Sequence, residues 1–419
     1  MVFVFIKNQR YIWTLLSLVL CLLCARTGAS CQDWNQWRGP GRDGVIATFD
    51  GPTRLPDTLA QRWKVTVGEG HSSPLVAGTR VYLLTRQGED EVIACYDLKS
   101  GKELWKNSYP AAYKMNPAAV NHGKGPKSTP LLAGGRIYTF GITGVLSCVD
   151  AANGQLKWRK EFANEFKQSS PAFGTAASPI FDNGVVIIHV GGQDNGALTA
   201  FDAQTGAVKW KWTGDGPAYS SPVIGEFAQT RQLITQSQKY VISVSPATGE
   251  LLWKIPFTTA YDQNAITPVI AGDLVVISGL DKGVTAYRPA KRNGVWSADQ
   301  VWQNMNVALY MSSPVINAGR LYGFSHKNKG QYFCLDIANG KVLWMSDGRQ
   351  GENASMLLAK GMILSLTNEA ELTEFPATDK MPSEFKKVRV ADSPTWAHPA
   401  FSGKEVLVKD KTTLALWSF

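Results

Sequence analysis

A serine or threonine followed by proline recurs through this 419-residue chain, and the residue two positions earlier varies in chemistry. The six Ser/Thr-Pro pairs begin at Ser73, Thr129, Ser178, Ser221, Thr267 and Ser313, and degenerate copies begin at Ser355 and His398. The residues two positions earlier are His71, Lys127, Ala176, Tyr219, Ala265, Met311, Asn353 and Trp396. Residues two apart in a strand point to the same side. These side chains can therefore gather in one place if the repeats are arranged around a centre.

Polar and aromatic groups that converge on one opening are typical of a ligand-binding site. We predict such a site at the mouth of a central channel. Its residues are His71, Lys127, Tyr219, Asn353, Trp396 and His398. The alternative interpretation is that these side chains only line a water-filled funnel and cap the ends of strands.

The two histidines of this set also raise the question of a metal site. Zinc normally requires further histidine, cysteine or carboxylate ligands, and only Glu69 lies close to His71 in the sequence. No Cys-x-x-Cys pair occurs after the first thirty residues. We therefore predict no metal ligands and expect both histidines to pack within loops.

Sequence signatures of catalysis are absent. The chain contains no G-x-S-x-G nucleophile elbow, no P-loop and no H-E-x-x-H zinc motif. We predict no catalytic residues, and the sequence favours binding over catalysis.

A second repeat must supply the elements that position the site. An acidic residue is followed by glycine four positions later and by tryptophan eight positions later, as in Asp97-Gly101-Trp105. Further copies begin at Asp150, Asp202, Ser245 and Asp336. A repeat of roughly 45 to 50 residues indicates many copies of one supersecondary unit.

Each unit has the pattern of a four-stranded meander. In the third unit we expect strands at 179–182, 185–190, 197–201 and 207–212. Aspartate at the last turn can bind the backbone two residues on, and glycine can adopt the positive φ that closes the turn. Eight such units predict an all-β, eight-bladed β-propeller.

The two ends of the propeller sequence complement one another. Residues 63–65 resemble a fourth strand without a blade, and residues 414–417 resemble a third strand with no fourth strand after it. Pairing them would complete the eighth blade and remove two exposed sheet edges. The fifth unit carries an insertion near Lys291, and in the seventh unit Phe385 could replace the missing tryptophan.

The Asp-Ala-x-Thr-Gly…Trp turns, most complete from Asp202 to Trp210, resemble the repeats of the pyrroloquinoline-quinone (PQQ)-like β-propeller family. The opening Trp34-Asn35-Gln36-Trp37-Arg38-Gly39-Pro40 is similar to secreted bacterial members. The family includes quinoprotein dehydrogenases and the outer-membrane assembly lipoprotein BamB. The resemblance implies a propeller fold over nearly the whole chain.

The dehydrogenase branch of the family carries an adjacent-cysteine disulfide and a glutamate, an asparagine and an aspartate around calcium. No two cysteines are adjacent in this chain, and no residues match the calcium motifs. The resemblance therefore favours the non-catalytic, BamB-like branch, and no cofactor is predicted.

The first thirty residues have the pattern of a signal peptide. Lys7 and Arg10 precede an apolar run at 11–23, and small residues follow at 27–30. An uncleaved anchor, or lipidation of Cys31 with peripheral membrane association, remains the alternative. We predict a signal peptide at 1–30, an extension at 31–60 and the propeller at 61–419.

Charge and cysteine content add two expectations. The formal charge is +9, and removal of the signal peptide leaves about +6, scattered without a basic run, which argues against nucleic-acid binding. Cys95, Cys148 and Cys334 occupy equivalent positions in different repeats, too far apart for disulfides. We expect them to be buried as small apolar residues.

These observations together predict an exported, periplasmic or extracellular, monomeric propeller that binds envelope or secreted proteins as a scaffold. One alternative is a PQQ- and calcium-dependent alcohol or sugar oxidoreductase. The other is a carbohydrate-binding propeller that uses Trp396 and Tyr219.

Overall fold

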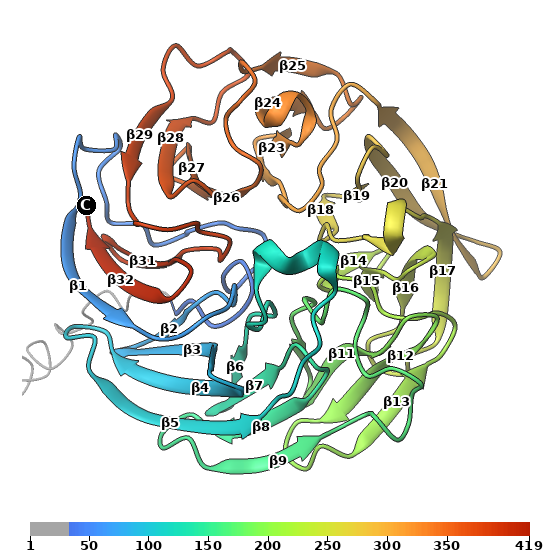
Figure 1. Cartoon of the computed structure of the whole chain (residues 1–419). Coiled ribbons are helices and arrows are strands. Elements are labelled where there is room, and N and C mark those ends of the chain that lie inside the picture. The colour runs from blue at the N-terminus through green and yellow to red at the C-terminus, as the bar shows by residue number, and fades with distance from the viewer. Residues whose placement is uncertain (1–32) are drawn as a thin grey trace, which may run out of the picture.

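The computed structural model describes residues 33–419, which form a ring of eight four-stranded antiparallel sheets (Figure 1). The predicted eight-bladed, all-β propeller is confirmed. The predicted signal peptide and Cys31 lie outside the described residues, so both stay predictions.

Within each blade, strands that follow one another in the sequence pair side by side. Blades 1 and 2 contain β2 (Leu75–Ala77), β3 (Arg80–Gln87), β4 (Asp90–Asp97), β5 (Glu103–Pro110), β6 (Leu131–Ala133), β7 (Arg136–Phe140), β8 (Leu146–Asp150) and β9 (Leu156–Lys160). Blades 3 and 4 contain β10 (Ile180–Asp182), β11 (Val185–Gly192), β12 (Asn195–Asp202), β13 (Val208–Trp212), β14 (Val223–Phe227), β15 (Thr230–Gln236), β16 (Tyr240–Val244) and β17 (Leu251–Pro256). The strands expected in the third unit therefore match β10 to β13 to within a few residues.

The second half of the ring repeats this order. Blades 5 and 6 contain β18 (Val269–Ala271), β19 (Leu274–Ser278), β20 (Val284–Arg292), β21 (Val295–Asn304), β22 (Val315–Asn317), β23 (Arg320–Ser325), β24 (Gln331–Asp336) and β25 (Val342–Met345). Blades 7 and 8 contain β26 (Ala354–Ala359), β27 (Met362–Thr367), β28 (Glu371–Pro376), β29 (Lys386–Arg389), β30 (Ala400–Ser402), β31 (Glu405–Lys409), β32 (Thr413–Ser418) and β1 (Ala60–Thr66). The insertion near Lys291 is the tip of the long β20–β21 hairpin, where Lys291 pairs with Trp296.

The eighth blade contains strands from both ends of the ring. β1 pairs antiparallel with β32, with Lys64 opposite Ala415 and a bulge between Gln61 and Trp63. The predicted closure is confirmed, and it pairs both strands at the point where the chain begins and ends the ring (Figure 1).

The glycine–tryptophan repeat joins neighbouring blades. Gly206 has φ +71°, and a Cβ atom at this position would lie 2.8 Å from Cδ2 of Trp158 in the preceding blade. The Trp158 indole nitrogen donates to the Ala203 carbonyl in the same turn at 3.2 Å. The same glycine-on-indole packing occurs at Gly101, Gly154, Gly249 and Gly340. Glycine is therefore required twice, for its backbone conformation and for the space that the indole occupies.

Blade 7 departs from the template. Phe385 does not replace the missing tryptophan, because its ring packs on Tyr332 and Trp344 of the preceding blade. Leu55 and Leu59, which precede β1, join the apolar cluster between blades 7 and 8 instead. The seventh interface is thus filled by chain from the other end of the sequence.

The Ser/Thr-Pro repeat forms contacts around the inner ring. The Thr129 amide donates to the Ser178 hydroxyl at 2.9 Å, and the Ser178 amide donates to the Ser221 hydroxyl at 2.9 Å. The Ser73 amide donates to the Thr129 hydroxyl at 3.2 Å. One function of the repeated hydroxyl is therefore to hydrogen-bond the preceding blade.

Residues 33–46 cross the centre of the ring and bind the inner strands of several blades. Trp34 forms a β-bridge with Val76 of blade 1, and Val45 forms one with Leu358 of blade 7. The Arg42 guanidinium donates to the Pro179 carbonyl at 2.8 Å. This segment enters the centre of the ring in blue in Figure 1. The extension therefore lies within the propeller and is not a free arm.

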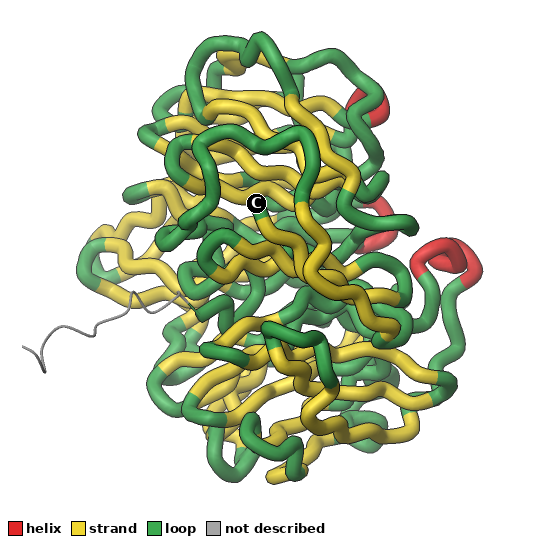
Figure 2. The backbone as a smooth tube through the Cα atoms, turned by 90° about the vertical axis from the view of Figure 1, so that its left-hand side faces the viewer, coloured by secondary structure: helices red, strands yellow, loops and turns green. Residues whose placement is uncertain are grey.

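The two faces of the ring differ. The three 3₁₀ helices of the described chain, η1 (Pro117–His122), η2 (Ala260–Asp262) and η3 (Lys327–Lys329), lie on one face (Figure 2). η1 and η2 lie in the long connections between blades, so we call this the top face. Among residues 33–419 no helix is long and apolar enough to cross a membrane. Cys95, Cys148 and Cys334 are buried free thiols, as predicted.

Candidate functional site

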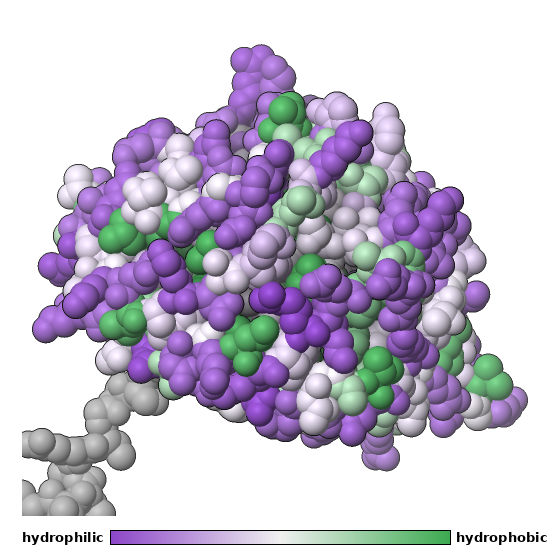
Figure 3. Space-filling view, turned by 60° about the horizontal axis from the view of Figure 1, so that its bottom comes forward, coloured by the Kyte–Doolittle hydropathy of each residue, from purple (hydrophilic) through white to green (hydrophobic). Residues whose placement is uncertain are grey.

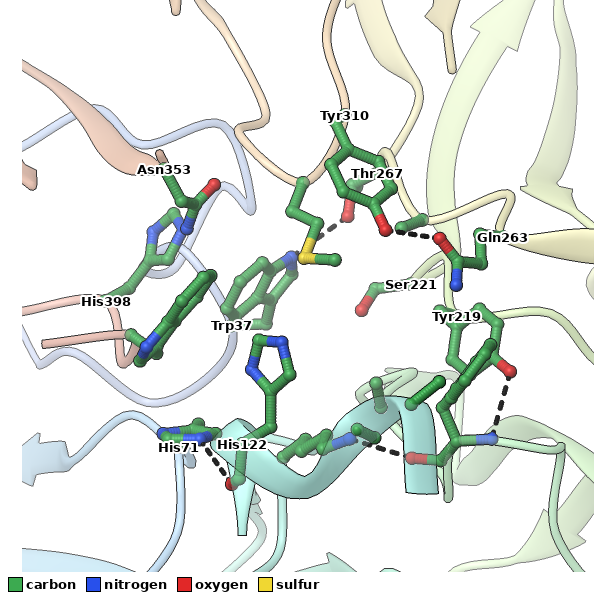
Figure 4. Close-up of a pocket in the computed structure, with 18 residues that line it drawn as sticks. Trp37, His71, His122, Tyr219, Ser221, Gln263, Thr267, Tyr310, Asn353 and His398 are labelled. Atoms are coloured by element: carbon green, nitrogen blue, oxygen red, sulfur yellow. Dashed lines mark hydrogen bonds between the residues drawn. The ribbon is translucent and has the colours of Figure 1, made fainter. Parts of the chain in front are cut away.

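A cavity of about 220 Å³ opens at the centre of the top face (Figure 4). All six predicted site residues line it. The eight positions two residues before the inner-ring repeat, which include five of those six, all contribute to its wall: His71, Lys127, Ala176, Tyr219, Ala265, Met311, Asn353 and Trp396. The repeat spacing therefore brings these side chains together, while binding of a ligand stays a prediction.

Residues outside the repeat complete the wall. Trp37 enters from the N-terminal extension, and its indole nitrogen donates to the Thr267 hydroxyl at 3.0 Å. His122 comes from η1, while Phe173 and Tyr310 come from later connections between blades. Sequence reasoning missed these residues because they lie in loops without a repeat. Only the unusual Trp34–Pro40 motif marked the extension that supplies Trp37.

The first wall of the cavity is made of aromatic rings near η1. The rings of His122 and Trp396 are 4.6 Å apart at 68°, an edge-to-face contact. The His71 ring nitrogen Nε2 donates to the His122 carbonyl at 2.8 Å. Figure 4 shows the His122 ring extending from the helix into the cavity, and His71 beside the end of the helix. These contacts hold η1 against blades 1 and 8.

Neutral polar groups line other parts of the cavity. The Tyr310 hydroxyl donates to the Gln263 side-chain oxygen, and the Phe173 amide donates to the Tyr219 hydroxyl at 3.2 Å. The Asn353 side-chain oxygen accepts a hydrogen bond from the Ser312 hydroxyl at 2.5 Å. The amide NH₂ groups of Gln263 and Asn353 are therefore the ends that remain to donate to a ligand.

Burial keeps the cavity histidines neutral. It lowers the pKa of His71 to about 3 and the pKa of His398 to about 3, with the positive charges of Lys127 and Arg38 contributing respectively. Burial also lowers the pKa of His122. The His398 ring lies 4.3 Å from the Trp37 ring, centroid to centroid. These histidines can accept or donate hydrogen bonds near neutral pH, but they carry no charge.

A metal site does not form from these residues. No group of three or more histidine, cysteine or acidic side chains is placed to hold a metal within residues 33–419. Glu69 lies outside the cavity, in a neighbouring groove that also contains Glu89 and Lys124. The Glu69 residue, which is close to His71 in the sequence, therefore lines the neighbouring groove and not this cavity.

Lys127 is the cationic side chain of the cavity wall. Its Nζ atom donates to the Phe173 carbonyl at 2.7 Å, and burial lowers its pKa to about 8. No aspartate or glutamate occurs among the lining residues, all of which lie in the described chain. The electrostatics therefore favour a neutral or anionic ligand over a cation.

Comparison with known proteins places the chain in a family. The model of the family described as outer membrane protein assembly factor BamB matches residues 89–346 and 281–380. The match covers more than half of the chain. This chain belongs to that family of PQQ-like β-propellers.

Relatives and solved structures agree with this assignment. BamB of Yersinia pestis is 24% identical over 300 residues, which cover 67% of this chain and 69% of that protein. BamB of Moranella endobia is 25% identical over 298 residues, which cover 69% of this chain and only 60% of that protein. Among solved structures, a europium-containing methanol dehydrogenase has a TM-score of 0.68 at 13% identity, covering 93% of this chain and 98% of that one. Such structural likeness at low identity shows the fold alone.

Proposed function

We propose that this chain is an exported, non-catalytic propeller that binds proteins at the cell envelope and assists the assembly of outer-membrane proteins. Family membership over 89–380 is the observation that carries this proposal. The export pattern of the sequence and a ring closed by the pairing of β1 with β32 fit the same role.

The top face offers a surface for such a partner. Three apolar side chains in its connections are solvent-exposed: Val120 at 60%, Tyr261 at 79% and Met305 at 51%. They surround the cavity on loops after blades 1, 4 and 5. On the side of the molecule drawn in Figure 3, apolar groups appear as separate small patches in a mainly hydrophilic surface. Loop contact by these three residues is the proposed mode of protein binding.

A deletion strain of the native host tests the proposal. We expect loss of the gene to lower the amount of folded β-barrel protein in the outer membrane, measured by heat-modifiable mobility in gels. Wild-type protein should restore it, and a Val120→Glu, Tyr261→Glu, Met305→Glu variant should not. Leu104→Glu with Val208→Glu is the matched control, because both residues are 47% exposed but lie on outer strands. Normal barrel levels in the deletion strain would contradict the assembly role.

The quinone oxidoreductase alternative is less well supported by the cavity. Calcium takes six to eight oxygen ligands, carboxylates among them, and no carboxylate lines the described wall. The residues therefore do not fit a calcium-bound quinone. Reconstitution with the quinone and calcium, followed by absorbance and dye-linked alcohol oxidation, tests this point; stoichiometric cofactor binding would overturn the non-catalytic proposal.

A further inference from the structure

Lys127 is a partly buried cation without a carboxylate partner. The Lys127 ammonium group has three N–H donors, but it forms one hydrogen bond, to the Phe173 carbonyl. Buried charges in proteins are usually paired with an opposite charge, and the wall of the cavity within residues 33–419 offers none. An anionic group on a ligand would satisfy both the charge and the unused donors.

Two indoles face the same cavity in fixed positions. Trp37 is held by its hydrogen bond to Thr267 and by the His398 ring, and Trp396 is held by the His122 ring. Trp37 lies centrally in the close-up of Figure 4, with His71 and His398 on one side and Gln263 and Ser221 on the other. Rigid aromatic faces of this kind offer stacking surface to a ring-shaped ligand at little entropic cost.

The polar groups of the cavity favour a sugar ring over an aromatic ring as the ligand. Gln263, Asn353 and Ser221 present amide and hydroxyl groups to the cavity. A flat aromatic acid would cover these groups without binding them, and each buried unsatisfied group carries a desolvation penalty. The hydroxyl groups of a sugar can pair with them. The volume of about 220 Å³ is also below the roughly 300–1,000 Å³ of pockets for drug-sized ligands.

We propose that the cavity binds a single acidic sugar ring of the uronate type, with its carboxylate at Lys127 and its ring against Trp37 or Trp396. The cavity lies between the proposed protein-binding loops, which supply His122, Gln263 and Tyr310 to its wall. A sugar ligand nevertheless goes beyond the scaffold function. The aromatic rings hold the apolar face of the sugar, and the amides and hydroxyls bind its edge.

Calorimetric titration of the full mature chain with three compounds tests the proposal. Glucuronate supplies the ring, hydroxyls and carboxylate; glucose lacks the carboxylate; benzoate lacks the hydroxyls. We expect glucuronate to bind about 10-fold or more tightly than either of the others, the scale of one charge-assisted hydrogen bond.

Variants separate the contributions. Lys127→Met should weaken glucuronate binding about 10-fold and leave the weak binding of glucose unchanged. Trp396→Ala should weaken both sugars. Lys102→Met is the matched control, since Lys102 is exposed in the Asp97–Trp105 turn on the face opposite the cavity. Circular dichroism and thermal melts confirm that each variant is folded.

Three results would overturn the proposal. These are no binding of glucuronate, benzoate binding as tightly as glucuronate, and undiminished glucuronate binding in the folded Lys127→Met variant. None of these results bears on the protein-binding role, because recovery of outer-membrane barrels in the deletion strain is measured independently. If glucuronate did not bind but the wild-type protein restored barrel levels in the deletion strain, the sugar-binding proposal would be wrong. The scaffold proposal would still stand.

Discussion

His398 takes the place of serine in the inner-ring repeat and lies fully inside the protein. Its ring contacts Trp37, and within residues 33–419 its Nδ1 atom has no hydrogen-bond partner. The nearby Arg38 guanidinium is also buried, and burial lowers the pKa of Arg38 to about 10. A second charge at His398 would therefore be costly. The centre of the channel is a place where added protons destabilise the fold.

This arrangement predicts acid sensitivity. Burial lowers the pKa of His71, His189 and His398 to about 3 to 4, so the unfolded chain binds more protons than the folded chain between about pH 6.5 and pH 3. The free energy of unfolding should therefore fall as the pH drops through this window. The His398→Gln variant should show a weaker dependence of the unfolding free energy on pH. Between pH 6.5 and 5 its unfolding free energy should fall by roughly 1 kcal/mol less than that of the wild type. Urea unfolding at several pH values measures it; an unchanged slope in the variant would rule out a neutral buried His398.

Lys127 gives a corresponding test at high pH. Burial lowers the pKa of Lys127 to about 8, as it does for Lys409. Between about pH 8 and the ordinary lysine range near 10.4 the unfolded chain again binds more protons, so unfolding free energy should rise with pH. Lys127→Met should flatten the rise by roughly 1 kcal/mol, whereas Lys102→Met should not. The readout is urea unfolding between pH 7.5 and 10, and equal slopes for the two variants would contradict a desolvated Lys127.

At the scale of elements, the fold could be predicted because each blade repeats one local solution. Asp202 binds the backbone amides of its turn, Gly206 supplies positive φ, and Trp158 of the preceding blade packs on that glycine. Each of these structural requirements places a particular residue type at a fixed spacing in the sequence. Trp37, His122 and Phe173 belong to no repeat, so no spacing indicated them. The half of the cavity built from the repeat was therefore predictable, and the half built from loops was not.

Gly206→Ala measures the contribution of this packing. The substitution adds a methyl group that would lie 2.8 Å from the Trp158 ring, in a backbone conformation with φ +71°. We expect a loss of roughly 2 kcal/mol or more in unfolding free energy. Gly184→Ala in the same blade is the control, because its φ is +83° but no atom lies within 4 Å of the added methyl. An equal loss in both variants would mean that backbone strain alone, and not the indole, sets the requirement.

At the scale of the whole molecule, stability should depend on joining the two chain ends. Deletion of residues 61–67 removes β1 and leaves the β32 edge unpaired, and it removes the Trp63 indole from the Leu98 carbonyl at 2.8 Å. We expect a loss of several kcal/mol and self-association through the free edge, seen by thermal melts and size-exclusion chromatography. Trp63→Ala, which keeps the strand, should cost less and remain monomeric. An unchanged melting temperature after the deletion would contradict the role of closure.

Contacts of the N-terminal extension constrain the order in which parts of the chain can fold. Val45 pairs with Leu358, and the Asp50 amide donates to the Gly403 carbonyl. During synthesis and the proposed export the N-terminal segment emerges first, but Leu358 and Gly403 emerge near the end. Contacts of such large sequence separation slow folding and prolong the exposure of unpaired edges. Part of the N-terminal extension and strand β1 therefore remain without their pairing partners until nearly the whole chain has been synthesised and exported.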